Sequence, residues 1–338
     1  SGYRINAEGT AYTPDGLPAQ VTTWNEGGAN TVVNTYTYNK RRLLIAETVS
    51  VNGGAPEAVG YSYDANGSMA GQARPGGLSL QYQPNALGQP TQVRDTSGQV
   101  YAQNITWHPG GSLARLQYGN GVQHQTVLNA RQFPAQLRDS GALALNYAYD
   151  ANGNVTAILD QQQGTSKDVR MQYDGHNRLV QATSAGFGGD GQFRYRYDVL
   201  DNLVSSHLGG IKAHNYWYDA KNRLTNVRDD SGATTIGLTY DVQGNLANRN
   251  GQLHTFDLGN RLREVPGIER YRYDAHGRRV TATDANGQRL FSLYGSDGTL
   301  LHEQRRDRGT IEQAAGLCAT RGCEGAAREA RRTGIAFR

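Results

Sequence analysis

The chain has 338 residues with a formal net charge of +4, and 37% of its residues are hydrophobic. Because soluble domains usually contain roughly 45–50% apolar residues, the sequence lacks the aliphatic side chains for one dense globular core of this length. Its 34 Lys and Arg are scattered and no apolar run approaches the ~20 residues of a membrane-spanning helix, so neither nucleic-acid binding nor a membrane span is expected.

One pattern recurs between about residue 30 and residue 304, whereas residues 1–29 diverge from it. The pattern is aromatic–x–aromatic–Asp–x–x–Gly, followed two residues later by an apolar residue, with Asn or Asp replacing Gly in some copies. A pattern that recurs along the chain at regular intervals indicates a repeat architecture. The second aromatic, or its degenerate equivalent, marks thirteen units at positions 38, 63, 84, 107, 128, 149, 173, 197, 218, 240, 256, 273 and 294.

Each unit predicts one β-hairpin. Two aromatic residues two positions apart lie on the same face of a strand, and Tyr favours strands. The Asp that follows suits a type I turn, where its carboxylate accepts backbone N–H groups, and the Gly or Asn three residues later supplies a positive φ. We assign a structural role to the turn aspartates Asp64, Asp150, Asp174, Asp198, Asp219, Asp241, Asp257 and Asp274.

The predicted fold is all-β: about thirteen hairpins in series form a curved, spiralling β-sheet, an open or partial shell with one layer and two solvated faces. The pattern resembles the YD-repeat (tyrosine–aspartate) or Rhs family, which includes bacterial polymorphic-toxin shells, the B and C components of insecticidal toxin complexes, and the teneurins. The stretches Trp107–Leu113 and Leu300–Gly309 are similar to this family too. The resemblance implies residues 1–304 to be a β-wall of the kind that encloses a C-terminal toxin domain.

From this resemblance we expect a structural scaffold and not an enzyme: a segment of a shell that encloses or delivers a toxin or other polypeptide cargo. The resemblance also implies a secreted or cell-surface bacterial protein, although no signal peptide is visible. The family's self-cleavage region is built around an Asp-Pro step, which this chain lacks, so we expect an incomplete wall, either a curved, open segment or a piece of something larger. No cofactor and no metal are expected, because no phosphate loop, His-Glu-x-x-His or CxxC motif occurs.

The composition changes after the last repeat. Residues 305–338 form a separate tail that is rich in Ala and Arg and has no Tyr, which favours helix or disorder. The tail is either the start of a cargo domain or a truncated end, and a segment this short cannot build an independent core. Its two cysteines, Cys318 and Cys323, are too few to staple the repeats.

One irregular stretch offers chemistry that the repeats do not explain. Between Trp107 and Phe133 the turn signature fades. If the chain has a catalytic site, we expect it at His108, Tyr118, His124 and Arg131. The alternative function is therefore a carbohydrate-binding or polysaccharide-cleaving surface, in which carboxylates supply acid–base groups. Aromatic rings would then stack on sugars, the candidate platforms being Trp107, Tyr118, Tyr147 and Trp217; the competing interpretation is that the Tyr rings pack on each other across strands.

Overall fold

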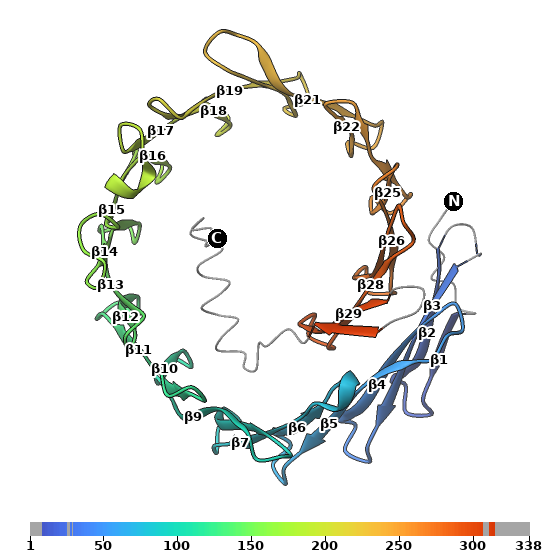
Figure 1. Ribbon diagram of the computed structural model, residues 1–338. Coiled ribbons are helices and arrows are strands. Elements are labelled where there is room, and N and C mark those ends of the chain that lie inside the picture. Colours follow the sequence, from blue (N-terminus) through green and yellow to red (C-terminus); the bar gives the residue numbers. More distant parts are fainter. Residues whose placement is uncertain (1–8, 26–27, 29, 307–310, 315–338) are drawn as a thin grey trace. The chain divides into compact units, whose positions relative to one another are not determined.

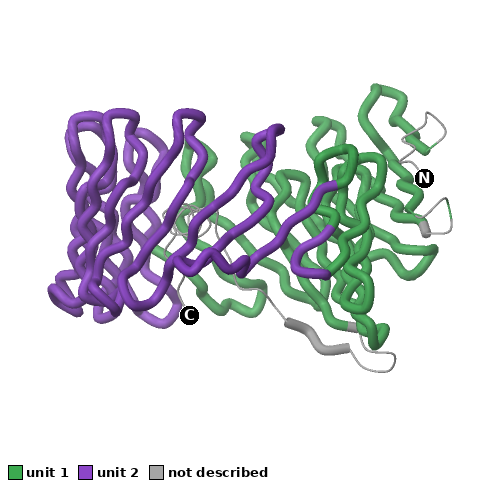
Figure 2. Tube along the Cα trace, turned by 90° about the horizontal axis from the view of Figure 1, so that it is seen from above, with its two compact units in different colours: residues 1–103, 241–247, 252–338 green, residues 104–240, 248–251 purple. Residues whose placement is uncertain are grey.

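The computed structural model describes residues 9–25, 28, 30–306 and 311–314, and it divides into two compact units (Figure 1, Figure 2). The first unit contains residues 1–103, 241–247 and 252–338, and the second contains residues 104–240 and 248–251. Strands and turns make up nearly all of the described chain, with short 3-10 helices at η3 (Pro75–Gly77) and η4 (Ala185–Phe187). The all-β fold with a long antiparallel sheet is therefore confirmed.

The first unit opens with a meander in which each strand pairs antiparallel with the next. The strand β9 continues beyond residue 103 into the second unit. The strands are β1 (Thr10–Tyr12), β2 (Pro18–Asn25), β3 (Asn30–Tyr38), β4 (Leu44–Val51), β5 (Glu57–Tyr63), β6 (Met69–Ala73), β7 (Ser79–Pro84), β8 (Pro90–Asp95) and β9 (Val100–Trp107).

The second unit continues the same antiparallel order, and strands β1–β23 are assigned to one 23-stranded sheet. Its strands are β10 (Leu113–Tyr118), β11 (Gln123–Leu128), β12 (Pro134–Asp139), β13 (Leu143–Tyr149), β14 (Val155–Asp160), β15 (Val169–Tyr173), β16 (Leu179–Thr183), β17 (Gln192–Tyr197), β18 (Leu203–Leu208), β19 (Lys212–Tyr218), β20 (Leu224–Arg228) and β21 (Thr234–Tyr240). The short strands β22 (Leu246–Arg249) and β23 (Gln252–Leu253) follow.

A second, seven-stranded sheet completes the first unit. Its strands are β24 (Thr255–Phe256), β25 (Leu262–Val265), β26 (Glu269–Tyr273), β27 (Arg279–Asp284), β28 (Arg289–Tyr294), β29 (Leu300–Arg306) and β30 (Ile311–Ala314). The backbone of β30 pairs antiparallel with β29, inside the tail for which the composition favours helix or disorder. Residues 315–338, including both cysteines, lie outside the described residues.

The repeat motif closes its hairpins as the sequence predicts. In the turn Asp150–Gly153, the Asp150 N–H donates to the Asn154 carbonyl at 3.0 Å and the Gly153 N–H donates to the Asp150 carbonyl at 3.2 Å. Gly153 has a φ of +94°, and Asn177, which stands in the Gly position of its own repeat, has a φ of +62°. Beside the second aromatic residue, Tyr149, the register of the two strands shifts. This shift is a β-bulge, in which one strand has an extra residue.

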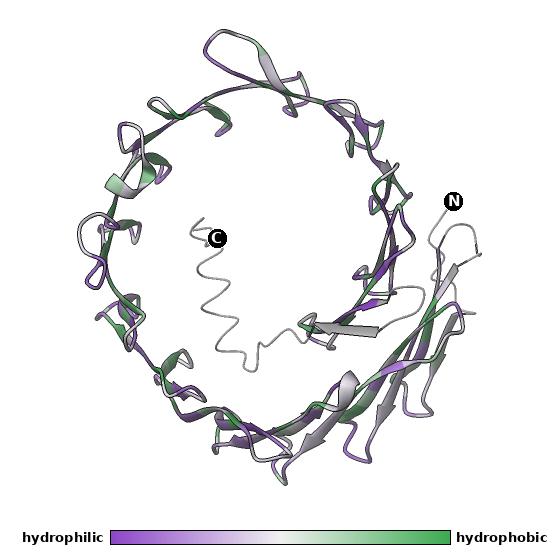
Figure 3. Cartoon of the chain, viewed as in Figure 1, coloured by the Kyte–Doolittle hydropathy of each residue, from purple (hydrophilic) through white to green (hydrophobic). Residues whose placement is uncertain are grey.

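The sheet of the second unit has one apolar and one polar face, because side chains alternate along each strand. Figure 3 shows hydrophobic and hydrophilic residues interleaved along the strands. The cross-strand register places four residues of the apolar face in one row: Met171, Ala182, Phe193 and Leu208. The neighbouring row on the polar face holds Gln172, Gln181, Arg194 and His207.

The expectation of a single layer with two solvated faces is wrong for the first unit, where the second sheet packs on the first. One buried cluster joins Val32, Val49, Val59 and Tyr61 of β3–β5 to Val280, Phe291, Leu293 and Leu301 of β27–β29. Val32, Val59 and Leu293 are fully buried. The repeat pattern could not reveal this layer, because it describes neighbours along the chain and the two sheets meet through residues more than 200 positions apart.

Polar contacts accompany this core between the two sheets. The fully buried Asn25 side chain donates to the Tyr273 carbonyl at 3.3 Å and accepts from the Tyr273 N–H at 3.2 Å, so β2 hydrogen-bonds to β26. Arg74 donates to the Leu301 carbonyl at 3.3 Å. Glu47, nearly fully buried, accepts a hydrogen bond from the Tyr61 hydroxyl, and burial raises the pKa of its carboxyl above the ordinary value.

Candidate functional site

The turn aspartates share one hydrogen-bond geometry. In the turn that begins at Asp219, one carboxylate oxygen accepts from the backbone N–H groups of Lys221 and Arg223, both at 2.9 Å. The second oxygen accepts from the Arg223 guanidinium at 2.9 Å. The carboxylate accepts a hydrogen bond from the backbone N–H four residues later in all eight predicted turn aspartates: Asp64, Asp150, Asp174, Asp198, Asp219, Asp241, Asp257 and Asp274. Their contribution to stability remains a prediction.

Further turns of the same kind occur outside the predicted set, and of these the sequence reasoning missed the ones at Asp95 and Asp229. Asp95, Asp229 and Asp284 accept backbone N–H groups two and four residues on. The signal was present as Asp-x-x-Gly at all three positions, but without the preceding aromatic pair. These turns lie between β8 and β9, β20 and β21, and β27 and β28, which is where one repeat passes to the next.

Between Asp150 and Asn222, consecutive turns are tied together by the residue four positions after Asp, which is Arg or Asn. Arg178 donates to Asp174 and reaches the next turn, where it contacts Asp201 at 2.7 Å. Asn202 donates to its own Asp198 and to Asn222 of the next turn at 2.7 Å. We call this series of linked turns, from Asp150 to Asn222, the turn row; it makes each hairpin a support for its neighbour.

Electrostatics within the turn row favour ionised carboxylates. The hydrogen bond from the Arg178 guanidinium, with help from backbone N–H groups, lowers the pKa of the Asp174 carboxyl to about 2. The pKa is also lowered at Asp150, Asp198 and Asp219, where the largest cause in each case is a hydrogen bond from the residue four positions on. These aspartates are therefore ionised hydrogen-bond acceptors within their own turns. An ionised carboxylate carries no proton to donate, so it is poorly suited to act as a general acid at neutral pH.

Where the second aromatic residue of a full repeat is Tyr, as at Tyr197 and Tyr218, its hydroxyl contacts the preceding hairpin. The Tyr218 hydroxyl donates to the Leu203 carbonyl at 2.9 Å, and the Tyr197 hydroxyl donates to the Leu179 carbonyl at 2.9 Å. In each case the acceptor is the first residue of the returning strand one repeat earlier. The Tyr side chains therefore bind neighbouring backbone, in addition to any ring packing between strands.

Three of the four candidate catalytic residues come together. The His124 side chain is buried, with Nδ1 at 2.7 Å from Asp139 and Nε2 at 3.1 Å from the Thr126 hydroxyl. His108 contacts the Thr126 carbonyl at 2.9 Å, and the Tyr118 ring lies edge-on to His124. Both His124 nitrogens are thus occupied by the protein itself. Asp139 was not anticipated from the sequence, because no motif marks it.

Arg131 lies apart from this cluster. Its guanidinium donates to the Asp150 carbonyl at 3.1 Å and stacks on the Phe133 ring at 4.8 Å from the centroid. Arg178 of the turn row makes the same two kinds of contact, with the Asp198 carbonyl and the Tyr197 ring, so the geometry assigns Arg131 to the wall.

A cavity of about 380 Å³ in the second unit differs from what a polysaccharide-cleaving surface requires. Its lining residues include neither a carboxylate nor an aromatic ring. Within the described part of the chain, no three His, Cys, Asp or Glu side chains gather as metal ligands do. Nor does that part contain a helix long and apolar enough to cross a membrane.

The architecture that emerges is a β-hairpin repeat wall, and comparisons place it among known proteins. The family model described as RHS Repeat matches residues 149–186 and 256–289. Toxin protein Tse5 of Pseudomonas aeruginosa is 29% identical over 300 residues, which is 78% of this chain and 21% of Tse5. The tRNA3(Ser)-specific nuclease WapA of Bacillus spizizenii is 24% identical over 303 residues, which is 82% of this chain and 13% of WapA.

A solved structure supports the same fold. The Tc holotoxin pore of Photorhabdus luminescens superimposes with a TM-score of 0.63 at 17% identity, covering 89% of this chain and 18% of that chain. The present chain therefore spans about a fifth or less of the length of these proteins. The hairpins within residues 149–186 and 256–289 match the RHS Repeat model, and the resemblance drawn from the sequence is confirmed.

Proposed function

We propose that this chain is a segment of an Rhs-type shell wall that encloses or delivers a toxin or another partner polypeptide. The observation that carries the proposal is the turn row, in which each hairpin is hydrogen-bonded to the next. Linked hairpins resist separation from their neighbours, which is the property that a barrier needs. A catalytic surface needs unlike groups that converge on one point, and repetition does not supply them.

The relatives support a scaffold on independent grounds. One is named as a toxin protein and another as a tRNA-specific nuclease, and the shared segment occupies 21% and 13% of their lengths. A segment common to proteins of different named activities is best explained as the part that carries or shields those activities. On the same reasoning we propose a secreted or cell-surface location in a bacterium and a polypeptide partner.

The test is protection of a partner from protease. The natural polypeptide that contains this wall is purified from its host and treated with trypsin, and the fragments are weighed by mass spectrometry. A partner polypeptide that survives while the wall is intact, and is digested once the wall is unfolded, supports enclosure.

The variant pair Arg178→Ala with Asn202→Ala removes two links of the turn row and is expected to expose the partner. Lys221→Ala, an exposed residue of the same turn row, serves as the matched control and should leave protection unchanged. If the partner is digested as fast with the wall intact as with the wall unfolded, this wall does not enclose it. If the variant pair protects the partner as well as the wild type does, the turn row is not what makes the wall a barrier.

A further inference from the structure

An exposed tryptophan stands on the polar face of the second unit. Trp217 is 44% exposed, although large aromatic side chains are usually well buried. Cross-strand register places it opposite Asn226 of β20, which in turn lies opposite Gly237 of β21. The Arg228 guanidinium stacks on the indole at 4.7 Å from the ring centroid, which holds the ring in place and leaves the remainder of it open to solvent.

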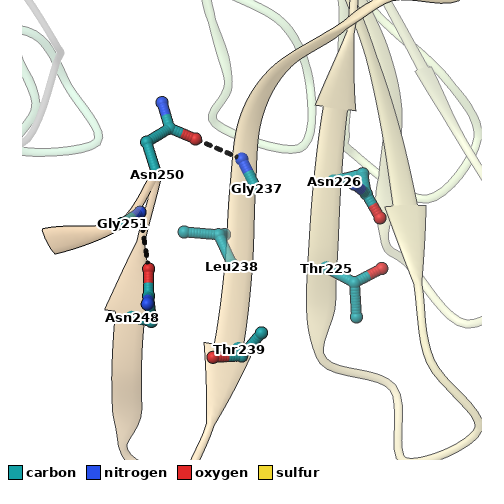
Figure 4. A pocket seen from close by; sticks show the side chains of 8 residues that line it. All are labelled: Thr225, Asn226, Gly237, Leu238, Thr239, Asn248, Asn250 and Gly251. Atoms are coloured by element: carbon teal, nitrogen blue, oxygen red, sulfur yellow. Dashed lines mark hydrogen bonds between the residues drawn. The ribbon is translucent and has the colours of Figure 1, made fainter. Parts of the chain in front are cut away.

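The 380 Å³ cavity begins at the cross-strand neighbour of this tryptophan. Its lining consists of Thr225, Asn226, Gly237, Leu238, Thr239, Asn248, Asn250 and Gly251, all in the second unit. Figure 4 shows these residues on three adjacent segments, with the Leu238 side chain in the space between the middle strand and the segment Asn248–Gly251. The space is wide open to solvent, so a ligand there would lie on the surface of the sheet and would not be enclosed.

Hydrogen bonds fix one side of this cavity and leave donors and acceptors on the other. Asn250 bridges the Gly237 N–H at 2.6 Å and the Thr235 carbonyl at 3.1 Å, so its amide completes the edge of β21. Asn248 accepts from the Gly251 N–H at 2.7 Å. In the described residues, neither the Asn248 amide nitrogen nor the Thr239 hydroxyl has a hydrogen-bond partner, so both can serve a ligand.

We propose that Trp217 and this cavity form a binding site for one ring of a neutral oligosaccharide. Amide and hydroxyl groups match the hydroxyls of a sugar, and an exposed indole offers an apolar surface for the C–H face of the ring. The lining holds no carboxylate for a cation and no Lys or Arg for an anion. It also holds a single aliphatic side chain, Leu238, which is too little for an apolar ligand.

The proposal goes beyond the shell function and does not rest on it. It also differs from a polysaccharide-cleaving surface, because the site contains no acid–base pair. The clustered residues His124 and Asp139 belong to other strands, β11 and β12, and have no part in it.

The experiment measures binding of chitotriose, cellotriose and maltotriose to the whole chain by titration calorimetry and by tryptophan fluorescence. At least one of them is expected to bind. Trp217→Ala should weaken that binding about tenfold or more, because the stacking surface is lost. Thr239→Val, a near-isosteric change at an exposed position, should weaken it roughly tenfold by removing one hydrogen bond.

Tyr12→Ala is the matched control, since Tyr12 is a more exposed aromatic residue, at 64%, on strand β1 of the first unit. It should leave binding unchanged, and all three variants should keep the wild-type melting temperature within a few degrees. The proposal is overturned if none of the three sugars binds at millimolar concentration. It is equally overturned if Trp217→Ala and Thr239→Val bind as the wild type does, or if Tyr12→Ala loses as much affinity as Trp217→Ala.

Discussion

Turn aspartates that share one hydrogen-bond geometry differ in how deeply they are buried. We expect this difference in burial to set how much each one contributes to the stability of the fold. The Asp274 side chain is fully buried and pairs with the Arg278 guanidinium at 2.8 Å. The Asp219 side chain, with the equivalent Arg223 pair at 2.8 Å, is one-quarter exposed. Water can replace part of the hydrogen bonding that the Asp219 carboxylate gives to Arg223, whereas water hardly reaches the buried Asp274 carboxylate.

We expect Asp274→Ala to lower the free energy of unfolding by about 3–5 kcal/mol, because it leaves the Arg278 guanidinium unpaired in a buried place. Urea unfolding followed by circular dichroism measures the change. Asp219→Ala is the matched control and should cost clearly less. Equal losses in the two variants would show that burial does not set the contribution of these turns.

Acid should destabilise the turn row. The folded-state pKa of Asp174 is about 2, below its ordinary value of 3.8. The folded state therefore prefers the ionised carboxylate. The stability that this gives is complete above the ordinary pKa and is lost as the pH falls from about 4 towards 2.

Melting temperatures measured by circular dichroism from pH 5 down to pH 2 test this expectation. Asp174→Asn removes the titrating group and should flatten the decline over that range. An Asp174→Asn variant that loses stability with pH as steeply as the wild type would contradict the assignment.

At the scale of the hairpin, the tyrosine hydroxyl links one repeat to the one before it. We expect Tyr218→Phe to lower the free energy of unfolding by about 1 kcal/mol, because the Leu203 carbonyl loses its donor while ring packing is kept. Tyr195→Phe is the control, since no partner is found for the Tyr195 hydroxyl among the described residues. Thermal or urea unfolding should separate the two variants; indistinguishable stabilities would mean that the hydroxyl contact is replaced by water at no cost.

Hairpins and turns were predictable because the information is local. Asp, two free positions and Gly or Asn suffice to specify each turn, and residues such as Asn177 confirm the positive φ. The contact from Tyr218 to the preceding repeat was not predictable, because strand alternation fixes a face but not the carbonyl that a hydroxyl reaches. The cavity beside Trp217 was not predictable for a related reason. No sequence pattern marks Asn248 and Asn250, and their position beside Gly237 depends on where β22 ends.

At the scale of the whole molecule, the largest departure from the sequence prediction is the second layer in the first unit. Its apolar cluster joins residues such as Val32 and Leu293, and no short-range pattern encodes that meeting. The buried Asn25 side chain joins the same two sheets by pairing with backbone 248 positions away.

We expect Asn25→Ala to lower the free energy of unfolding by about 1–3 kcal/mol, because the partly buried N–H and C=O of Tyr273 lose their partner. Hydrogen exchange should accelerate in both β2 and β26, although they are far apart in the chain. Asn152→Ala, an exposed turn residue, should leave exchange in both strands unchanged. Faster exchange confined to β2 would show that the side chain does not join the sheets.

The distance along the chain between the two layers has a consequence for synthesis on the ribosome. Val32, Val49 and Val59 leave the ribosome early, but their covering partners Val280, Phe291 and Leu293 are still more than 200 residues from being made. At about 5–20 residues per second, roughly 10 to 50 seconds pass before the second layer exists. The nascent chain therefore presents an apolar sheet face throughout that interval, and it is there that we expect a chaperone to engage the growing polypeptide.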